Sequence, residues 1–265
     1  MSSDNPLGDA VLLLLEYRRN NHSDGERKLL EIASAAASFL STSGQLYRFE
    51  DFRKSLQPGQ VRSLSFADVM HYLEQLRSQA QSAEEKETLR GASDALIFIE
   101  ASGQHEGLED YLDYWRSSSL PPVIAAFDTR EQADAWLEHQ SVPPYKARVL
   151  IGGEYHVVFA TREDRDWPFI PTPVVGEFIE DQLEKGLPPV VATFDTREQA
   201  EAWLAALTNP PRHAFISIGG KHHVAACWKN VNHRAIYPFT LADDLARERQ
   251  AGLERLSRGT KREEE

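Results

Sequence analysis

The chain has only one cysteine, Cys227, among its 265 residues. A single thiol cannot close a disulfide within the chain, and no further cysteines or histidines surround it at zinc-ligand spacing. We therefore expect a protein of a reducing compartment, the cytoplasm, that holds no metal.

Long apolar runs are missing as well. The run at residues 10–15 is too short for the core of a signal peptide, and Asp4 and Asp9 precede it where basic residues would be needed. No stretch approaches the roughly 20 apolar residues that span a bilayer. We expect neither an export signal nor a membrane segment.

Basic residues are outnumbered, with 29 Lys and Arg against 41 Asp and Glu and a formal net charge of −12. Nucleic-acid binding needs a basic face that displaces counterions from phosphates. The charge therefore opposes a nucleic-acid partner and favours a basic protein, toward which an acidic surface steers association.

Motifs for common catalytic and cofactor sites are also absent. The sequence contains no phosphate-binding loop, no nucleophile elbow and no HExxH metal site. Two glycine pairs, Gly152-Gly153 and Gly219-Gly220, lie between predicted strands rather than before a helix. We predict no catalytic residue, no cofactor and no metal ligand.

What the chain does contain is a second copy of part of itself. The segment from Leu120 to Leu137 returns 67 residues later as Leu187 to Leu204. In each copy a proline pair ends a helix and leads into a strand, and an aspartate then caps the next helix. The glycine pairs form hairpins between two further strands. The sequence thus predicts repeats at 107–173 and 174–240, each ordered helix, strand, helix, strand, strand.

Residues 1–105 show apolar positions at helical spacing instead, with Ser-x-x-Glu capping boxes that begin at Ser23 and Ser82. The predicted fold class is α+β. An N-terminal helical bundle over 1–105 precedes a domain at 106–240, in which two tandem αβαββ repeats form a pseudo-twofold sheet with helices on one face. The strands form either one continuous six-stranded sheet or two packed sheets. A charged helix and a disordered tail are expected at 241–265.

Two arginines at equivalent repeat positions, Arg130 and Arg197, are candidate partner-binding residues. A cation in the first turn of a helix opposes the helix dipole. Each arginine therefore either pairs with a nearby carboxylate or contacts a partner.

Two histidines, His156 and His223, also coincide at the 67-residue offset. Matched histidines serve as proton-transfer groups or metal ligands, or simply as hydrogen-bonded residues of a sheet. If they converge in space, an enzyme with a site between the repeats is an alternative reading.

The end of each repeat carries an aromatic-proline-phenylalanine triplet, at Trp167-Pro168-Phe169 and Tyr237-Pro238-Phe239. These rings either pack on the sheet edge or anchor a partner, since large aromatics bury much area at small entropic cost. Trp167, Phe169, Tyr237 and Phe239 are therefore candidate partner-binding residues.

The pattern Val-x-Ala-x-Phe-x-Thr-Arg-Glu-x-Ala at 123–133, followed by Gly-x-Tyr-His-Val at 153–157, resembles half of a SPOR domain. SPOR domains are bacterial modules that bind denuded peptidoglycan. The resemblance implies glycan binding outside the cytoplasmic membrane, whereas the N-terminus shows no export signal.

The favoured hypothesis is a non-enzymatic cytosolic protein-binding module. An acidic bundle joined to a repeat domain suits an adaptor, an inhibitor or an immunity protein that neutralises a basic toxin. The oligomeric state stays open, as do the SPOR-like and enzymatic alternatives.

Overall fold

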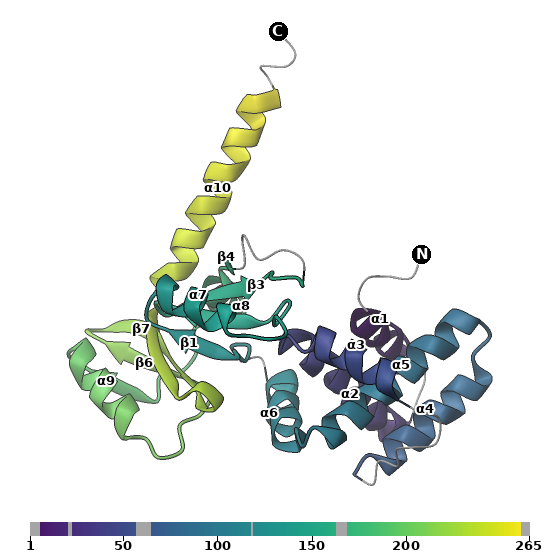
Figure 1. Cartoon of the computed structure of the whole chain (residues 1–265). Helices are drawn as coiled ribbons and strands as arrows, with labels where there is room; N and C mark the ends of the chain where they lie inside the picture. The colour runs from purple at the N-terminus through teal and green to yellow at the C-terminus, as the bar shows by residue number, and fades with distance from the viewer. Residues whose placement is uncertain (1–5, 21–22, 57–64, 118, 163–168, 261–265) are drawn as a thin grey trace. The chain divides into compact units, whose positions relative to one another are not determined.

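The structure is a computed structural model that describes residues 6–20, 23–56, 65–117, 119–162 and 169–260 (Figure 1). Over these residues the chain has ten α-helices, mostly N-terminal, and two four-stranded sheets. The predicted α+β class is confirmed. Among the described helices, none is both long and apolar enough to cross a membrane.

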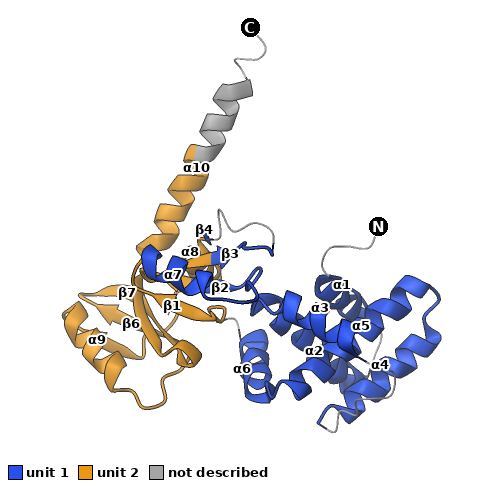
Figure 2. Cartoon of the chain, in the orientation of Figure 1, with its two compact units in different colours: residues 1–118, 130–149, 157–170 blue, residues 119–129, 150–156, 171–265 orange. Residues whose placement is uncertain are grey.

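The chain divides into two compact units (Figure 2). Unit 1 contains residues 1–118, 130–149 and 157–170, and unit 2 contains 119–129, 150–156 and 171–265. The first repeat contributes residues to both units.

Six helices build most of unit 1. They are α1 (Pro6–Arg19), α2 (Asp24–Thr42), α3 (Leu46–Ser55), α4 (Ala67–Gln79), α5 (Ala83–Ala101) and α6 (His105–Arg116). The capping box at Ser23 and Glu26 is formed, and the Ser82 side chain accepts the backbone N–H of Glu85. Helix α2 buries a run of small residues, Ala33 to Ala37, which lets neighbouring helices approach closely.

The remaining elements follow the order of the repeats. The first repeat continues with β1 (Ala125–Phe127), α7 (Arg130–Glu138), β2 (Arg148–Ile151), β3 (Glu154–Val158) and β4 (Phe169–Pro171). The second contains α8 (Val174–Glu184), β5 (Ala192–Phe194), α9 (Arg197–Ala206), β6 (His213–Ile218), β7 (Lys221–Trp228), a 3₁₀ turn at Lys229–Val231 and β8 (His233–Pro238). Helix α10 (Thr240–Thr260) follows, and the predicted tail at 261–265 lies outside the described residues.

The two sheets have the strand orders β1-β2-β3-β4 and β5-β6-β7-β8. In the second sheet β5 runs parallel to β6, and the other pairs are antiparallel. The expectation of three strands per repeat was wrong, because each repeat has four. Of the two predicted arrangements, the single six-stranded sheet was also wrong, because the strands form two separate sheets. Each fourth strand ends at a proline and lies at a sheet edge, where a missing N–H donor is tolerated.

Several contacts recur at the 67-residue offset. The N–H of Gly152 donates to the carbonyl of Phe127 at 2.9 Å, and that of Gly219 donates to the carbonyl of Phe194 at 2.9 Å. These glycines have φ of +59° and +55°, a conformation that side chains with a Cβ rarely adopt. The glycine pairs therefore close both hairpins, as predicted.

The fourth strands keep the same offset. Thr172 N–H donates to the Tyr155 carbonyl, and Phe239 N–H donates to the His222 carbonyl, so Thr172 corresponds to Phe239. The comparison of Trp167-Pro-Phe with Tyr237-Pro-Phe was therefore shifted by three residues. Backbone pairing fixes the register of a strand, so the two similar triplets do not occupy equivalent positions.

Candidate functional site

A groove of about 530 Å³ lies between helices α1 and α5 of unit 1. Among the described residues that line it, the charged ones are all carboxylates, and leucine and tyrosine side chains lie among them. Lining residues come from α1 and its end (Asp9, Leu12, Leu13, Glu16, Tyr17, Asn20) and from the start of α5 (Ser82, Glu84, Glu85, Thr88). We call this feature the acidic groove.

Local helix physics explains part of the groove. Leu7, Ala10 and Leu14 of α1 are fully buried, so the adjoining face of the same helix carries Asp9 and Glu16 toward solvent. On α5, the acids of the first turn favour the positive end of the helix dipole. Glu16 has no such local role, because a carboxylate near a helix C-terminus opposes the dipole.

Leu12 stands at the groove with 69% of its surface exposed. Exposed leucines are common singly, but this one lies among four carboxylates in a concave surface. The groove therefore combines negative charge with an apolar contact point.

Tyr17 is held inside the groove by Glu85, whose carboxylate accepts a hydrogen bond from the phenol. Burial raises the pKa of Tyr17 to about 12, and the hydrogen bond and charge of Glu85 add to this effect. The same hydrogen bond lowers the pKa of Glu85. At neutral pH the phenol is therefore protonated and Glu85 is ionised.

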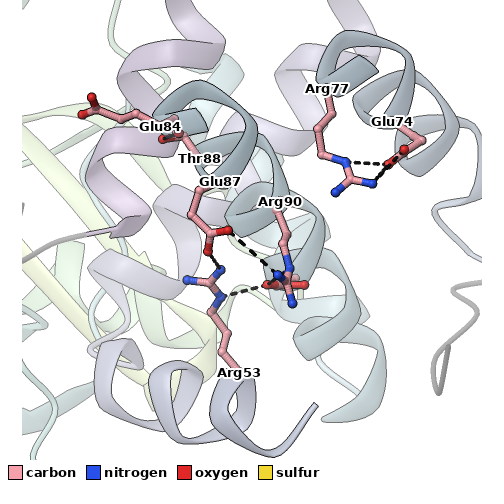
Figure 3. A network of polar contacts seen from close by, with 8 residues as sticks. Arg53, Glu74, Arg77, Glu84, Glu87, Thr88 and Arg90 are labelled. Atoms are coloured by element: carbon pink, nitrogen blue, oxygen red, sulfur yellow. Dashed lines mark hydrogen bonds and ion pairs between the residues drawn. The ribbon is translucent and has the colours of Figure 1, made fainter. Parts of the chain in front are cut away.

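The arginines near α5 have acidic partners of their own (Figure 3). Arg53 bonds to Asp94 at 2.8 Å and to Glu87 at 2.7 Å, while Arg77 pairs with Glu74 at 2.8 Å. Figure 3 shows Glu84 extending away from Arg53 and its partners. These cations therefore leave the charge of the acidic groove in place.

The predicted arginines both form ion pairs within their own helices. Arg130 lies 3.0 Å from Asp134, and Arg197 lies 2.7 Å from Glu201, again at equivalent positions. Beyond these pairs, the Arg130 guanidinium lies over the Phe169 ring at 4.8 Å, and Arg197 donates to the carbonyl of Ile236. The first-turn arginines thus have carboxylate partners one helical turn away.

The two histidines make the same local bond. Nδ1 of His156 lies 3.1 Å from the Glu154 carbonyl, and Nδ1 of His223 lies 2.9 Å from the Lys221 carbonyl. A carbonyl can only accept, so Nδ1 carries the proton in each ring. No cluster of three or more His, Cys, Asp or Glu that could hold a metal occurs in the described part of the chain.

Three of the four predicted aromatics contact the protein itself, and Trp167 lies outside the described residues. Phe169 is buried beside Arg130. Tyr237 donates to the Gly153 carbonyl at 2.6 Å, and its pKa is raised by burial and by the charge of Glu154. Phe239 packs edge-on against Phe215 at 6.0 Å.

Two of the predicted residues, Arg197 and Tyr237, share a cleft in unit 2. Both line a cleft of about 600 Å³ that also includes the Gly152-Gly153 hairpin. His156 and His223 are not among the residues that line this cleft.

The acidic groove was not found from the sequence. The sequence gives a weak indication of the α1 side of the groove. Asp9 and Glu16 are seven residues apart, so they share a helix face, and Leu12 and Leu13 lie between them. The α5 side of the groove depends on tertiary packing that no local pattern reports.

Comparison of the chain with protein-family models, curated proteins and solved structures gives no match. The likeness to half of a SPOR domain thus rests on the motifs at 123–133 and 153–157 alone.

Proposed function

We propose that the chain is a non-enzymatic protein-binding module whose acidic groove receives a basic segment of a partner protein. The observation that carries this proposal is the groove itself, where the charged lining residues within the described part of the chain are Asp9, Glu16, Glu84 and Glu85. A lysine or arginine in the groove would meet carboxylates, and an apolar neighbour would cover Leu12.

The net charge of −12 supports the same partner class. Long-range attraction raises the association rate for a basic protein, and salt screens it over about 10 Å at 0.1 M ionic strength. An adaptor, an inhibitor or an immunity protein that neutralises a basic toxin in the cytosol would work in this way. Binding should therefore weaken as salt rises.

The repeat domain serves this function as a scaffold. We propose that its two halves are copies of one folding unit, related by a pseudo-twofold axis and with helices on one face. The recurring hairpin bonds of Gly152 and Gly219 and the recurring arginine ion pairs support this arrangement.

The alternatives stay predictions that no observed contact favours. The enzymatic one requires His156 and His223 to share a site, and each histidine is bonded to a carbonyl of its own strand. The SPOR-like one requires a glycan surface, for which the motif resemblance is the only support.

The test uses a fluorescent octapeptide of alternating leucine and arginine and measures its binding to the full chain by anisotropy. Glu16→Gln/Glu84→Gln is expected to weaken binding about tenfold at low salt, because two charge contacts with the peptide are lost. The matched control Glu106→Gln/Glu109→Gln removes the same charge from exposed positions of α6. It should leave the affinity within about twofold.

Two further peptides separate charge from apolar contact. Replacing arginine by glutamate should abolish binding, and replacing leucine by serine should weaken it. Equal loss in both protein variants would show diffuse attraction to a negative surface and would contradict a groove-specific site.

A further inference from the structure

Unit 2 exposes a short apolar segment, Leu187-Pro-Pro-Val-Val191, between α8 and β5. Leu187, Val190 and Val191 are 60%, 37% and 68% exposed. No charged residue occurs from 186 to 194, although a quarter of the chain is charged. Exposed apolar side chains gathered in one segment make it a candidate interaction surface. We call residues 187–191 the docking strip.

The same sequence is buried in the first repeat. Leu120-Pro-Pro-Val123 is identical to the first four residues of the docking strip, yet Leu120 is 2% exposed and Val123 is 1% exposed. One sequence therefore occupies opposite environments within one unit, and the buried copy shows what such a segment packs against.

Two aromatic side chains cover the buried copy. The phenol of Tyr155 donates to the Pro121 carbonyl at 2.7 Å, and the indole N–H of Trp228 donates to the same carbonyl at 3.2 Å. The rings of Tyr155 and Trp228 also meet edge-on at 5.9 Å, in one core with Leu120 and Val123. The cover thus combines apolar area with donors aimed at a proline carbonyl.

An amide completes this cover. The side-chain amide of Asn230 donates to the Val123 carbonyl at 2.6 Å. The equivalent carbonyls of the docking strip belong to Pro188 and Val190. Within the described residues, neither of these carbonyls accepts a hydrogen bond from a side chain.

A second copy of the chain is not a matching cover. The surface of Trp228 and Asn230 is already filled by residues 120–123 of the same chain. At the 67-residue offset, Thr161 of the first repeat stands where Trp228 stands in the second, so the indole has no counterpart there.

We infer that residues 187–191 dock a different protein, one that presents an indole or phenol donor and a side-chain amide on an uncharged apolar surface. Proline-containing segments bind aromatic-lined grooves in this way, because their prolines restrict the chain before binding and lower its entropic cost. The uncharged docking strip complements an uncharged patch, whereas the acidic groove complements a basic segment. The two surfaces therefore require partners of different chemistry.

The test selects binders to the full chain from a phage-displayed dodecapeptide library. Selected peptides should be enriched in tryptophan or tyrosine together with asparagine or glutamine. Leu187→Ser/Val191→Ser should weaken their binding at least tenfold, whereas Ile170→Ser, which changes another exposed apolar residue, should leave it unchanged. Both altered sites are exposed, so thermal melting should match the original chain.

Other outcomes overturn the inference. These are the recovery of no binder that Leu187→Ser/Val191→Ser weakens, or the recovery of binders that this double variant weakens but that carry no aromatic residue. Sedimentation that shows a dimer lost on Leu187→Ser/Val191→Ser would make a second copy the occupant instead. Glu16→Gln/Glu84→Gln should not affect these peptides, so failure of the acidic groove and failure of the docking strip are distinguishable.

Discussion

Single residues of this protein take their properties from neighbours far away in the sequence. Tyr17 of α1 and Glu85 of α5 are joined by a hydrogen bond, although 68 positions separate them. The sequence predicted both helices and the cap at Ser82, because those features are local. It could not predict this pair, because its formation depends on which helices pack together.

The Tyr17 pair predicts a pH dependence. The pKa of Tyr17 is raised from 10.0 to about 12, so the folded state favours the protonated phenol. Its contribution to stability is fully present below pH 10 and is lost as pH rises from 10 toward about 12. Tyr17→Phe should therefore flatten the decline in melting temperature over that range.

Tyr114→Phe is the control for this measurement, because it removes a phenol of α6 and leaves the hydrogen bond between Tyr17 and Glu85 in place. The assigned hydrogen bond would be contradicted if the melting temperature of Tyr17→Phe fell with alkaline pH as in the original chain. It would also be contradicted if the Tyr17 phenol, identified by the difference in ultraviolet absorbance between the two proteins, titrated near pH 10.

At the scale of elements, the order of helices and strands followed from the repeat, and their environments did not. Proline pairs and glycine hairpins are local signals, and the structure contains the corresponding elements. The predicted aspartate cap was wrong at α9, whose N-cap is Thr196, the next residue, because its hydroxyl accepts the backbone N–H of Gln199. The fourth strands were missed because β4 and β8 include prolines and pair only at an edge. The identical Leu-Pro-Pro-Val segments show the limit most clearly, since the difference in burial comes entirely from what packs on them.

The cover of residues 120–123 predicts an effect on stability. Trp228→Phe removes the indole donor while Tyr155 still serves the Pro121 carbonyl, so the free energy of unfolding should fall by about 1–2 kcal/mol. Trp203→Phe makes the same change at a half-buried indole that packs on Phe194, and it should lower the free energy of unfolding less. Urea unfolding measures the free energy of unfolding of both variants. Equal losses of stability in the two would contradict a stabilising role for the hydrogen bond of the Trp228 indole.

At the scale of the whole molecule, we propose one binding surface in each unit, and the two surfaces differ in chemistry. The acidic groove of unit 1 suits a basic segment, and the docking strip of unit 2 suits an uncharged aromatic patch. Composition predicts a basic partner from the net charge of −12, and this partner remains a proposal. It could not predict where the charge gathers or where apolar surface is left exposed, because both depend on the folded arrangement.

Amide hydrogen exchange of the full chain, with and without the leucine-arginine octapeptide, tests the central claim most directly. The proposal predicts slower exchange in α1 and in residues 82–88, with residues 187–191 unchanged, and loss of this protection in Glu16→Gln/Glu84→Gln. Protection confined to unit 2, or none at saturating peptide, would contradict the acidic groove as the binding site.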